Sequence, residues 1–214
     1  MAKLRFDISM SLDGYTAGPD QSEDDPLGKG GDRLHEWVIK LEAWRAPHGK
    51  EAGEVNDSSP VVEEALENIG AHIMGRNMFG GGPGPWDDDN PWNGWWGDDP
   101  PFHTPVFVLT HHVREPLELE GGNVFTFVTD GIESALSQAS DAAGAKDIHL
   151  AGGASVAQQY LAAGLVDEME INVAPILLGD GTRLLENLPA DLKFEPVRAV
   201  GTPDVTHLKY RVSR

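Results

Sequence analysis

The sequence predicts an α/β protein of three layers, in which helices cover both faces of a mixed central sheet. Through most of the chain, short apolar segments typical of strands alternate with segments whose apolar residues follow helical spacing. The chain then closes with two strand-like segments, 192–200 and 205–212, that have no helix between them. Strands joined by helices pair in parallel and consecutive strands pair antiparallel, so we expect both kinds of pairing in one sheet.

The individual strands are predicted from short apolar runs that end at turn residues. Before the terminal pair they cover residues 3–10, 71–74, 105–110, 124–128, 147–151 and 168–173. The strict alternation of polar and apolar residues in 168–173 predicts a strand with one face in water.

Helices are predicted where apolar residues recur every three or four positions. The segments concerned are 34–44, 60–69, 132–139 and 153–161. Asp32 is the expected N-cap of the first, and Ser58-Ser59-Pro60 forms a capping sequence for the second. The chain shows no internal repeat and no linker, so we predict one domain over residues 1–214.

The composition excludes several classes of function. Acidic residues outnumber basic ones 35 to 16, giving a formal charge of −19. Because no basic stripe overrides this charge, we expect no nucleic-acid partner. The absence of cysteine excludes disulfides, thiolate zinc sites and cysteine nucleophiles. No apolar run is long enough to cross a bilayer and no signal-peptide stretch opens the chain, so we expect a cytoplasmic protein with no membrane partner.

Two strand ends carry residue types that bind phosphate. At Gly152-Gly153-Ala154-Ser155-Val156 a strand ends in two glycines and a helix begins at once. Glycines let a ligand approach the backbone, and the N–H groups of a helix start point at an anion. The second end, Gly75-Arg76-Asn77, adds an arginine that can hold a phosphate through two hydrogen bonds. The alternatives are a tight strand-to-helix turn for the first and a surface salt bridge for the second.

Six short blocks, in this order along the chain, carry a resemblance to a known family. They are Ser11-Leu12-Asp13-Gly14, Met74-Gly75-Arg76, Val108-Leu109-Thr110, Leu150-Ala151-Gly152-Gly153-Ala154, Ala163-Gly164-Leu165-Val166-Asp167-Glu168 and Pro175-Ile176-Leu177-Leu178-Gly179-Asp180-Gly181. Together they resemble the dihydrofolate reductase superfamily, closest to the reductase domain of the riboflavin-biosynthesis deaminase/reductase. The resemblance spans residues 3–213. It implies a dihydrofolate reductase-like fold, NADPH as cofactor, hydride transfer to a small pyrimidine or pterin, and a homodimer.

The resemblance also implies roles for individual residues. Arg76, between Gly75 and Asn77, would bind the 2′-phosphate of NADPH, with Thr110 near the same adenosine. The pyrophosphate would be surrounded by Gly152, Gly153, Ala154, Ser155 and Val156, and the substrate would be faced by Asp13, Trp37, Pro175, Leu178 and Gly179. Met78 stands where the family often has a threonine that contacts phosphate. The chain has no zinc-deaminase signature, so we expect a stand-alone reductase-like domain.

Hydride transfer to an electrophilic carbon also needs a proton source if nitrogen or oxygen ends up reduced. Asp13 and Asp32 are the candidate catalytic acids, and His35 and Glu36 are further candidates on the predicted helix. Each aspartate has a structural alternative, because Asp32 suits an N-cap and Asp13-Gly14 suits a turn.

Residues 85–96, here called the Trp-rich segment, hold four of the six tryptophans. They predict a lid or wall beside the substrate pocket or a dimer contact, or else a loop folded onto its own domain. Neither their acidic residues nor the histidines have the spacing of a known metal site, so no metal is predicted. Two other functions stay open: a non-catalytic binding module that keeps the nucleotide cleft, and a flavin-binding reductase.

Overall fold

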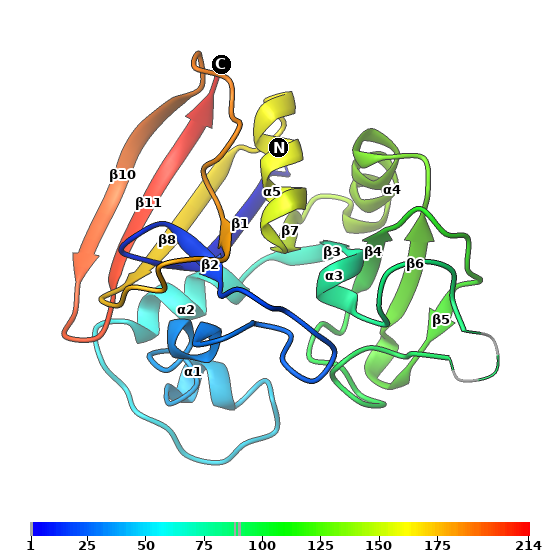
Figure 1. Cartoon of the computed structure of the whole chain (residues 1–214), viewed down its shortest axis with the longest axis horizontal. Coiled ribbons are helices and arrows are strands. Elements are labelled where there is room, and N and C mark those ends of the chain that lie inside the picture. The colour runs from blue at the N-terminus through cyan, green and yellow to red at the C-terminus, as the bar shows by residue number, and fades with distance from the viewer. Residues whose placement is uncertain (1, 88, 90) are drawn as a thin grey trace.

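The computed structural model describes residues 2–87, 89 and 91–214, and within these residues nine strands form one sheet (Figure 1). The strand order across the sheet is β10-β11-β8-β1-β7-β3-β4-β6-β5. The strands are β1 (Leu4–Ser11), β3 (Ile69–Gly75), β4 (Pro105–Leu109), β5 (Leu117–Glu118), β6 (Val124–Val128), β7 (Asp147–Gly152), β8 (Glu168–Ala174), β10 (Lys193–Gly201) and β11 (Thr206–Ser213). A separate two-stranded sheet pairs β2 (Tyr15–Ala17) with β9 (Thr182–Arg183).

The sheet is mixed, as the sequence predicts. The six strands from β8 to β6 in the sheet order pair in parallel. At one side β11 runs antiparallel to β8 and β10 antiparallel to β11, and at the other side β5 runs antiparallel to β6. Because the six central strands are parallel, their C-terminal ends lie along one edge of the sheet.

Two helices, α4 (Ile132–Ala143) and α5 (Ala154–Ala163), cover one face of the sheet (Figure 1). The apolar side of each strand points at them, and the main core contains Leu4, Phe6, Ala71, Ile73, Ile148 and Leu150 from the strands with Ala135, Ala139, Tyr160 and Leu161 from the helices. This packing follows from the period-two alternation of the strands, which places every second residue in the core.

Two separate coverings protect the opposite face. Over β11 and β8 lie α2 (Ser59–Leu66), the 3-10 turn η1 (Gly31–Leu34) and α1 (Glu42–Arg45), which pack through Trp37, Leu41, Val62 and Val205. Over β4 and β6 lie α3 (Arg76–Phe79) and the Trp-rich segment, with the turn η2 (Glu120–Gly122) nearby. The two coverings leave the middle of this face, over β1 and β7, between them.

The region predicted as one helix from Leu34 to Trp44 is not one helix, and that prediction is wrong. Leu41 has extended backbone angles (φ −75°, ψ 138°) and the chain on either side of it pairs with Glu54. These hydrogen bonds break the segment into a 3-10 turn and a one-turn helix. Asp32 lies inside the turn and caps nothing, because the N-cap is Gly30. The apolar spacing still marks the buried side chains Leu34, Trp37 and Leu41.

Helix α2 begins where Ser58-Ser59-Pro60 predicts, yet the Ser58 hydroxyl does not cap it. It instead donates to Nε2 of His207 on β11, at 2.9 Å, and the Nδ1 of His207 donates to Asn172 on β8, at 2.6 Å. All three side chains are buried. The capping serine therefore joins α2 to the sheet, because the buried imidazole needs two partners.

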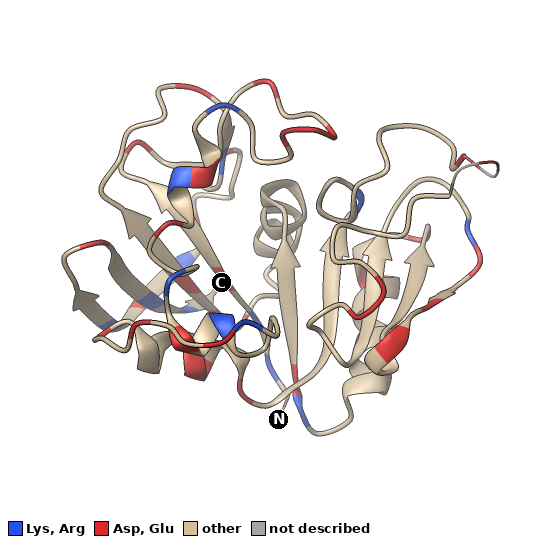
Figure 2. Ribbon diagram, turned by 90° about the horizontal axis from the view of Figure 1, so that it is seen from below, with Lys and Arg blue, Asp and Glu red and all other residues tan. Residues whose placement is uncertain are grey.

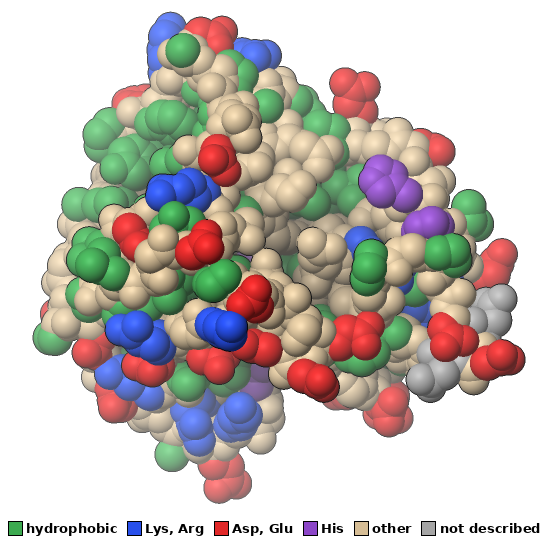
Figure 3. Space-filling view, in the orientation of Figure 1, with side chains coloured by type: hydrophobic (Ala, Val, Ile, Leu, Met, Phe, Trp, Pro, Cys, Tyr) green, Lys and Arg blue, Asp and Glu red, His purple; other side chains and the backbone are tan. Residues whose placement is uncertain are grey.

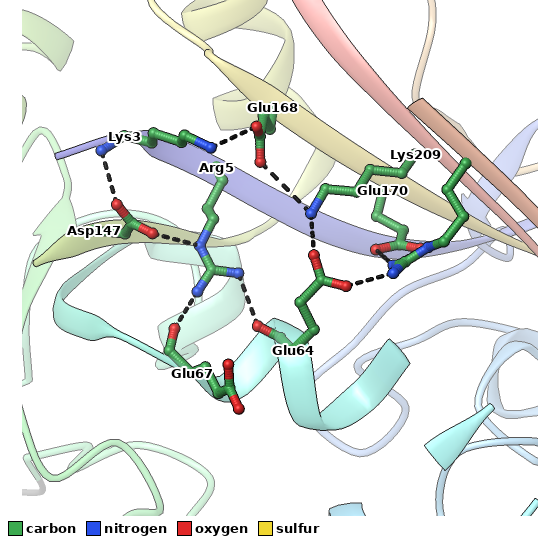
Figure 4. A network of polar contacts seen from close by, with 9 residues as sticks. Lys3, Arg5, Glu64, Glu67, Asp147, Glu168, Glu170 and Lys209 are labelled. Carbon is green, nitrogen blue, oxygen red and sulfur yellow. Dashed lines mark hydrogen bonds and ion pairs between the residues drawn. The ribbon is translucent and has the colours of Figure 1, made fainter. Parts of the chain in front are cut away.

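The prediction that β8 has one face in water is also wrong. Its polar residues Glu170 and Asn172 are buried under α2. Figure 4 shows the ionic network that makes this possible: Arg198 of β10 donates to both oxygens of Glu170, at 2.8 and 2.9 Å, and Glu64 of α2 binds Arg198 and Lys209. Burial of a carboxylate is tolerated when such partners replace its water.

The remaining charges lie mainly on loops and outer elements, as Figure 2 shows. None of the helices in the described ranges is long and apolar enough to cross a membrane.

Candidate nucleotide and substrate site

The sequence elements with phosphate-binding character come together at the C-terminal edge of the parallel strands. Strand β3 ends at Gly75, directly before α3, and β7 ends at Gly152, directly before α5. Met74 and Gly152 are paired across the two strands. In space-filling view the surface is hollowed between the two halves of the molecule at this place (Figure 3).

Helix α5 presents a bare N-terminus at this edge. Its N-cap is Gly153, so no side chain caps the first N–H groups, and the Gly152–Gly153 peptide bond is cis. A Cβ placed on Gly153 would meet nothing within 4 Å, which leaves room beside the backbone. Unpaired N–H groups with the helix dipole behind them attract an anion.

Gly75 allows the first turn of α5 to lie close against the end of β3. A Cβ at Gly75 would lie 2.6 Å from Cγ2 of Val156 in the first turn of α5. Any larger residue would push α5 away from β3, and Arg76 follows directly. Of the other predicted contacts, Ala154 and Val156 are buried in this junction, while Ser155 and Asn77 are exposed on it.

Arg76 does not form the surface salt bridge that was its alternative interpretation. Its Nε and Nη2 donate to the carbonyls of Gly80 and Gly81, at 3.0 and 2.8 Å, and its guanidinium stacks on Trp86. Its buried Nη1 has no hydrogen-bond partner among the described residues. Burial and the charge of Arg114 lower the pKa of Arg76. The guanidinium is thus fixed in place with one donor available.

Thr110 follows β4 at the same edge and is buried. Its N–H donates to Val128, and its hydroxyl accepts from the N–H of His112 at 3.2 Å. It shapes the loop that leaves β4.

Asp13 organises the loop that follows β8. Its carboxylate accepts from the Ser11 hydroxyl at 2.6 Å and from the N–H groups of Leu178 and Gly179, at 3.2 and 2.7 Å. The Ser11 hydrogen bond, with those from the two amides, lowers the pKa of Asp13 to about 2. Asp13 therefore stays ionised and holds the substrate-facing turn predicted from Pro175, Leu178 and Gly179. Pro175 and Gly179 are exposed, and Leu178 is half-buried.

The other residues predicted on the substrate side, Asp32 and Trp37, differ in their exposure to solvent. Asp32 is exposed on the turn η1, whereas Trp37 is buried and donates from its indole nitrogen to Ser9 at 3.1 Å. His35 lies close by, and burial lowers its pKa against the opposing charges of Asp32 and Asp7. Trp37 thus supports the wall of the site from within the core.

Asp7 and His149 were not singled out by any motif. They lie on β1 and β7, on the face away from α4 and α5, and Nε2 of His149 donates to Oδ1 of Asp7 at 2.9 Å. Their side chains keep 35% and 16% of their accessible surface. The signal in the sequence is that polar residues occupy the second face of a central strand, where apolar residues usually lie.

The described residues of the Trp-rich segment fold onto their own domain, and residues 88 and 90 lie outside the described part of the chain. Trp92 and Trp95 donate from their indole nitrogens to the carbonyls of Phe79 and Met78, and Trp86 donates to His112. Its aromatic rings pack on Phe79, Phe125 and Phe127. The segment thereby forms the outer support of α3 and Arg76.

Comparison with known proteins identifies the family. The RibD C-terminal domain profile matches residues 2–208. An uncharacterized protein of Bacillus subtilis, YyaP, is 30% identical over 199 residues, covering 91% of this chain and 86% of that protein. A putative riboflavin biosynthesis protein from Shewanella sp. PV-4 has a similar structure, with a TM-score of 0.63, 24% identity and 99% of each chain covered. Dihydrofolate reductase from Enterococcus faecalis shares the fold, with a TM-score of 0.52, 15% identity and coverage of 99% of this chain and 96% of that one.

Proposed function

The chain belongs to the RibD C-terminal domain family, and we propose that it is an NADPH-dependent reductase of a small heterocycle. The substrate would be a pyrimidine, such as 5-amino-6-(5-phosphoribosylamino)uracil, or a pterin. The observation that carries the proposal is the meeting of Gly75-Arg76 with the bare α5 N-terminus at Gly152-Gly153. One anchored arginine and one helix dipole at the same edge suit a ligand with two separate phosphate groups.

The residues present fit this cofactor. Arg76 has one buried donor without a partner among the residues that the structure describes, and a Cβ on Gly153 would meet nothing within 4 Å. Arg76 would hold the 2′-phosphate, Thr110 would lie near the adenosine, and the amides from Gly152 to Val156 would hold the pyrophosphate. When bound, NADPH supplies the hydride, while the protein fixes its position and that of the substrate.

The chain's own residues would orient the substrate and restrict water. Asp13 holds the turn from Pro175 to Gly179 beside the end of β1, where Leu12 also donates to Ile176. This turn would form one wall of the substrate site. With a pKa of about 2, Asp13 has no proton to give near neutral pH, so its role is to position the wall.

A second candidate is a non-catalytic module that binds the nucleotide. Asp13 is ionised and Asp32 is exposed on a turn, which favours this alternative because neither is placed as a proton donor. Met78 lies at the strand end as well, with its sulfur 3.1 Å from a Cβ placed on Gly152. Steady NADPH oxidation with a heterocycle would exclude a purely binding role.

The test is a titration with NADPH and, separately, with NADH, followed by tryptophan fluorescence. We expect NADPH to bind more tightly than NADH, and Arg76→Ala to lose that preference by about tenfold or more, the loss of one charge-assisted phosphate contact. Arg211→Ala is the matched control, because Arg211 pairs with Glu195 on the outer strands. Failure of both nucleotides to bind at about 1 mM, near −4 kcal/mol, would overturn the proposal.

A further inference from the structure

The middle of the second sheet face is open to solvent at Asp7. Strand β1 lies between β8 and β7 in the centre of the sheet, where a helix layer normally buries the side chains. The Asp7 side chain nevertheless keeps about a third of its accessible surface. On one side Trp37 packs on Ser9, and on the other Phe102 packs on His72 of β3. Asp7 and His149 lie on the sheet between these two contacts with 35% and 16% of their side-chain surface exposed, and this partly exposed strip of the sheet face is here called the groove.

The floor of this groove is held in one geometry. His149 donates from Nε2 to Asp7, and the ring of His72 meets that of His149 edge-on at 5.3 Å. His72 is fixed in turn by Thr104, with Nδ1 and Oγ1 2.8 Å apart. Burial opposes ionisation of Asp7, but the hydrogen bond from His149 and the charges of His149 and Arg5 outweigh it and lower the pKa of Asp7. Near neutral pH the groove therefore presents a carboxylate.

Two buried nitrogen atoms beside this carboxylate lack partners. They are Nδ1 of His149 and Nδ1 of His35, neither of which has a hydrogen-bond partner among the described residues. Buried polar atoms of this kind are normally satisfied, so unpaired ones indicate a place for a polar ligand. No three acidic or imidazole groups in the described part of the chain converge as metal ligands. A polar organic ligand suits the groove better.

Arg5, whose charge lowers the pKa of Asp7, forms its hydrogen bonds and its ion pair with other groups. Arg5 pairs with Asp147 at 3.3 Å and donates to the carbonyls of Glu64 and Glu67 at the end of α2. Figure 4 shows its guanidinium turned to these groups. A phosphate placed against Asp7 would therefore be repelled by its carboxylate, and Arg5 would not be free to offset that repulsion.

The groove continues into the proposed cofactor site. His149 and Ala151 point to the same face of β7, and the strand then delivers Gly152 and Gly153. At about 3.3 Å per residue, His149 lies roughly 10 Å along the strand from Gly152. A ring bound over Asp7 would thus lie beside a cofactor held at the α5 N-terminus.

We propose that Asp7 is the substrate-recognition residue of this site, that His149 positions it, and that the substrate is an unphosphorylated nitrogen heterocycle with N–H donors. The ring or amino N–H groups would donate to the Asp7 carboxylate and to Nδ1 of His149, which is an acceptor when Nε2 donates to Asp7. The inference rests on the proposed reductase function but narrows its substrate class.

The test compares two probes that differ only by a phosphate, 5-amino-6-ribosylaminouracil and its 5′-phosphate. Calorimetric titration of the whole protein at neutral pH should show the unphosphorylated compound binding at least about tenfold more tightly, because the Asp7 carboxylate repels a second anion. Asp7→Asn should weaken binding of the unphosphorylated probe about tenfold through loss of charge-assisted hydrogen bonds and should reduce the discrimination against phosphate.

Two further variants separate recognition from folding. Asp141→Asn removes the same charge from the exposed surface of α4, on the opposite face, and should leave binding unchanged. His149→Gln keeps an N–H donor for Asp7 and should retain most of the binding, whereas His149→Leu should lose it. A merely structural role for His149 would make both variants equally defective.

The inference is overturned if the phosphorylated probe binds as tightly, if Asp7→Asn binds the unphosphorylated probe as well as wild type, or if neither probe binds at about 1 mM. Titration with NADPH is run on the same samples. Loss of probe binding with intact NADPH binding would refute this inference alone. Probe binding through Asp7 without NADPH binding would refute the reductase proposal and leave Asp7 as the recognition residue.

Discussion

The guanidinium carbon of Arg76 lies 3.1 Å from the centre of the Trp86 indole ring. Trp86 belongs to the Trp-rich segment, and Arg76 belongs to the strand end that is proposed to bind phosphate. Arg114 lies 4.8 Å from the same ring and donates to Trp92 and Asn93. The contact joins two parts of the sequence that carry no common motif, and it orients the arginine before any ligand arrives.

Replacing Trp86 should therefore weaken nucleotide selectivity. A cation–π contact of this kind contributes about 0.5–2 kcal/mol, so Trp86→Leu should raise the Kd for NADPH by about two- to thirtyfold and that for NADH much less. Trp86→Phe should retain most of the selectivity because it keeps an aromatic face. Trp44→Leu is the control, since Trp44 contacts Lys50 and His48 away from this site. Unchanged NADPH preference in Trp86→Leu would contradict this account.

Hydrogen exchange at the backbone amides of Leu178 and Gly179 measures whether Asp13 holds the turn, because both amides donate to its carboxylate. In Asp13→Asn, the side chain can accept through one atom only, so hydrogen exchange at both amides should become faster. Because the folded pKa of Asp13 is about 2 and its ordinary value is 3.8, its contribution to stability is present above pH 4 and is lost as pH falls through 2. Asp180→Asn is the control, since Asp180 accepts from Gly181 instead. Equal exchange in wild type and Asp13→Asn would show that Asp13 does not hold the turn.

His207 should make the folded protein sensitive to mild acid. Burial lowers the pKa of His207 to about 4, while an unfolded chain protonates it near 6.5. Its lowered folded pKa gives stability that is complete above pH 6.5 and is lost as pH falls towards 4, amounting to about 3 kcal/mol. Urea unfolding at a series of pH values should show this loss, and His207→Gln should reduce it. The pKa values of His35 and His72 are also lowered, so these residues would account for the acid-dependent loss of stability that persists in His207→Gln. An identical pH dependence in the variant would exclude this role.

Glu170 tests whether the ionic network in Figure 4 stabilises the outer strands. Burial raises the pKa of Glu170 against the hydrogen bonds and charge of Arg198. Glu170→Gln leaves Arg198 with Glu64 as its one anionic partner among the described residues and should lower the free energy of unfolding by about 2 kcal/mol. Glu195→Gln breaks an exposed pair with Arg211 and should have no measurable effect. Similar urea midpoints for both variants would show that burial does not strengthen the network.

Local patterns in the sequence were sufficient for most of the architecture. Alternation in residues 3–10 and 147–151 identified the strands β1 and β7, and the unbroken run from Gly152 into Val156 located the start of α5. Such features depend on neighbours along the chain, because period and glycine content act within a few residues. The mixed sheet followed from the order of these elements, and the family resemblance was confirmed.

Only the tertiary structure decided what each polar side chain does. Leu34 to Trp44 has helical spacing, but pairing with Glu54 breaks the helix, and Ser58 leaves its cap for His207. Glu170 is polar in the sequence yet buried, because Arg198 reaches it from another strand. The contact between Asp7 and His149 joins residues 142 positions apart. Burial and hydrogen bonding depend on contacts between distant segments, and these contacts overcome local propensity wherever a polar group loses its water.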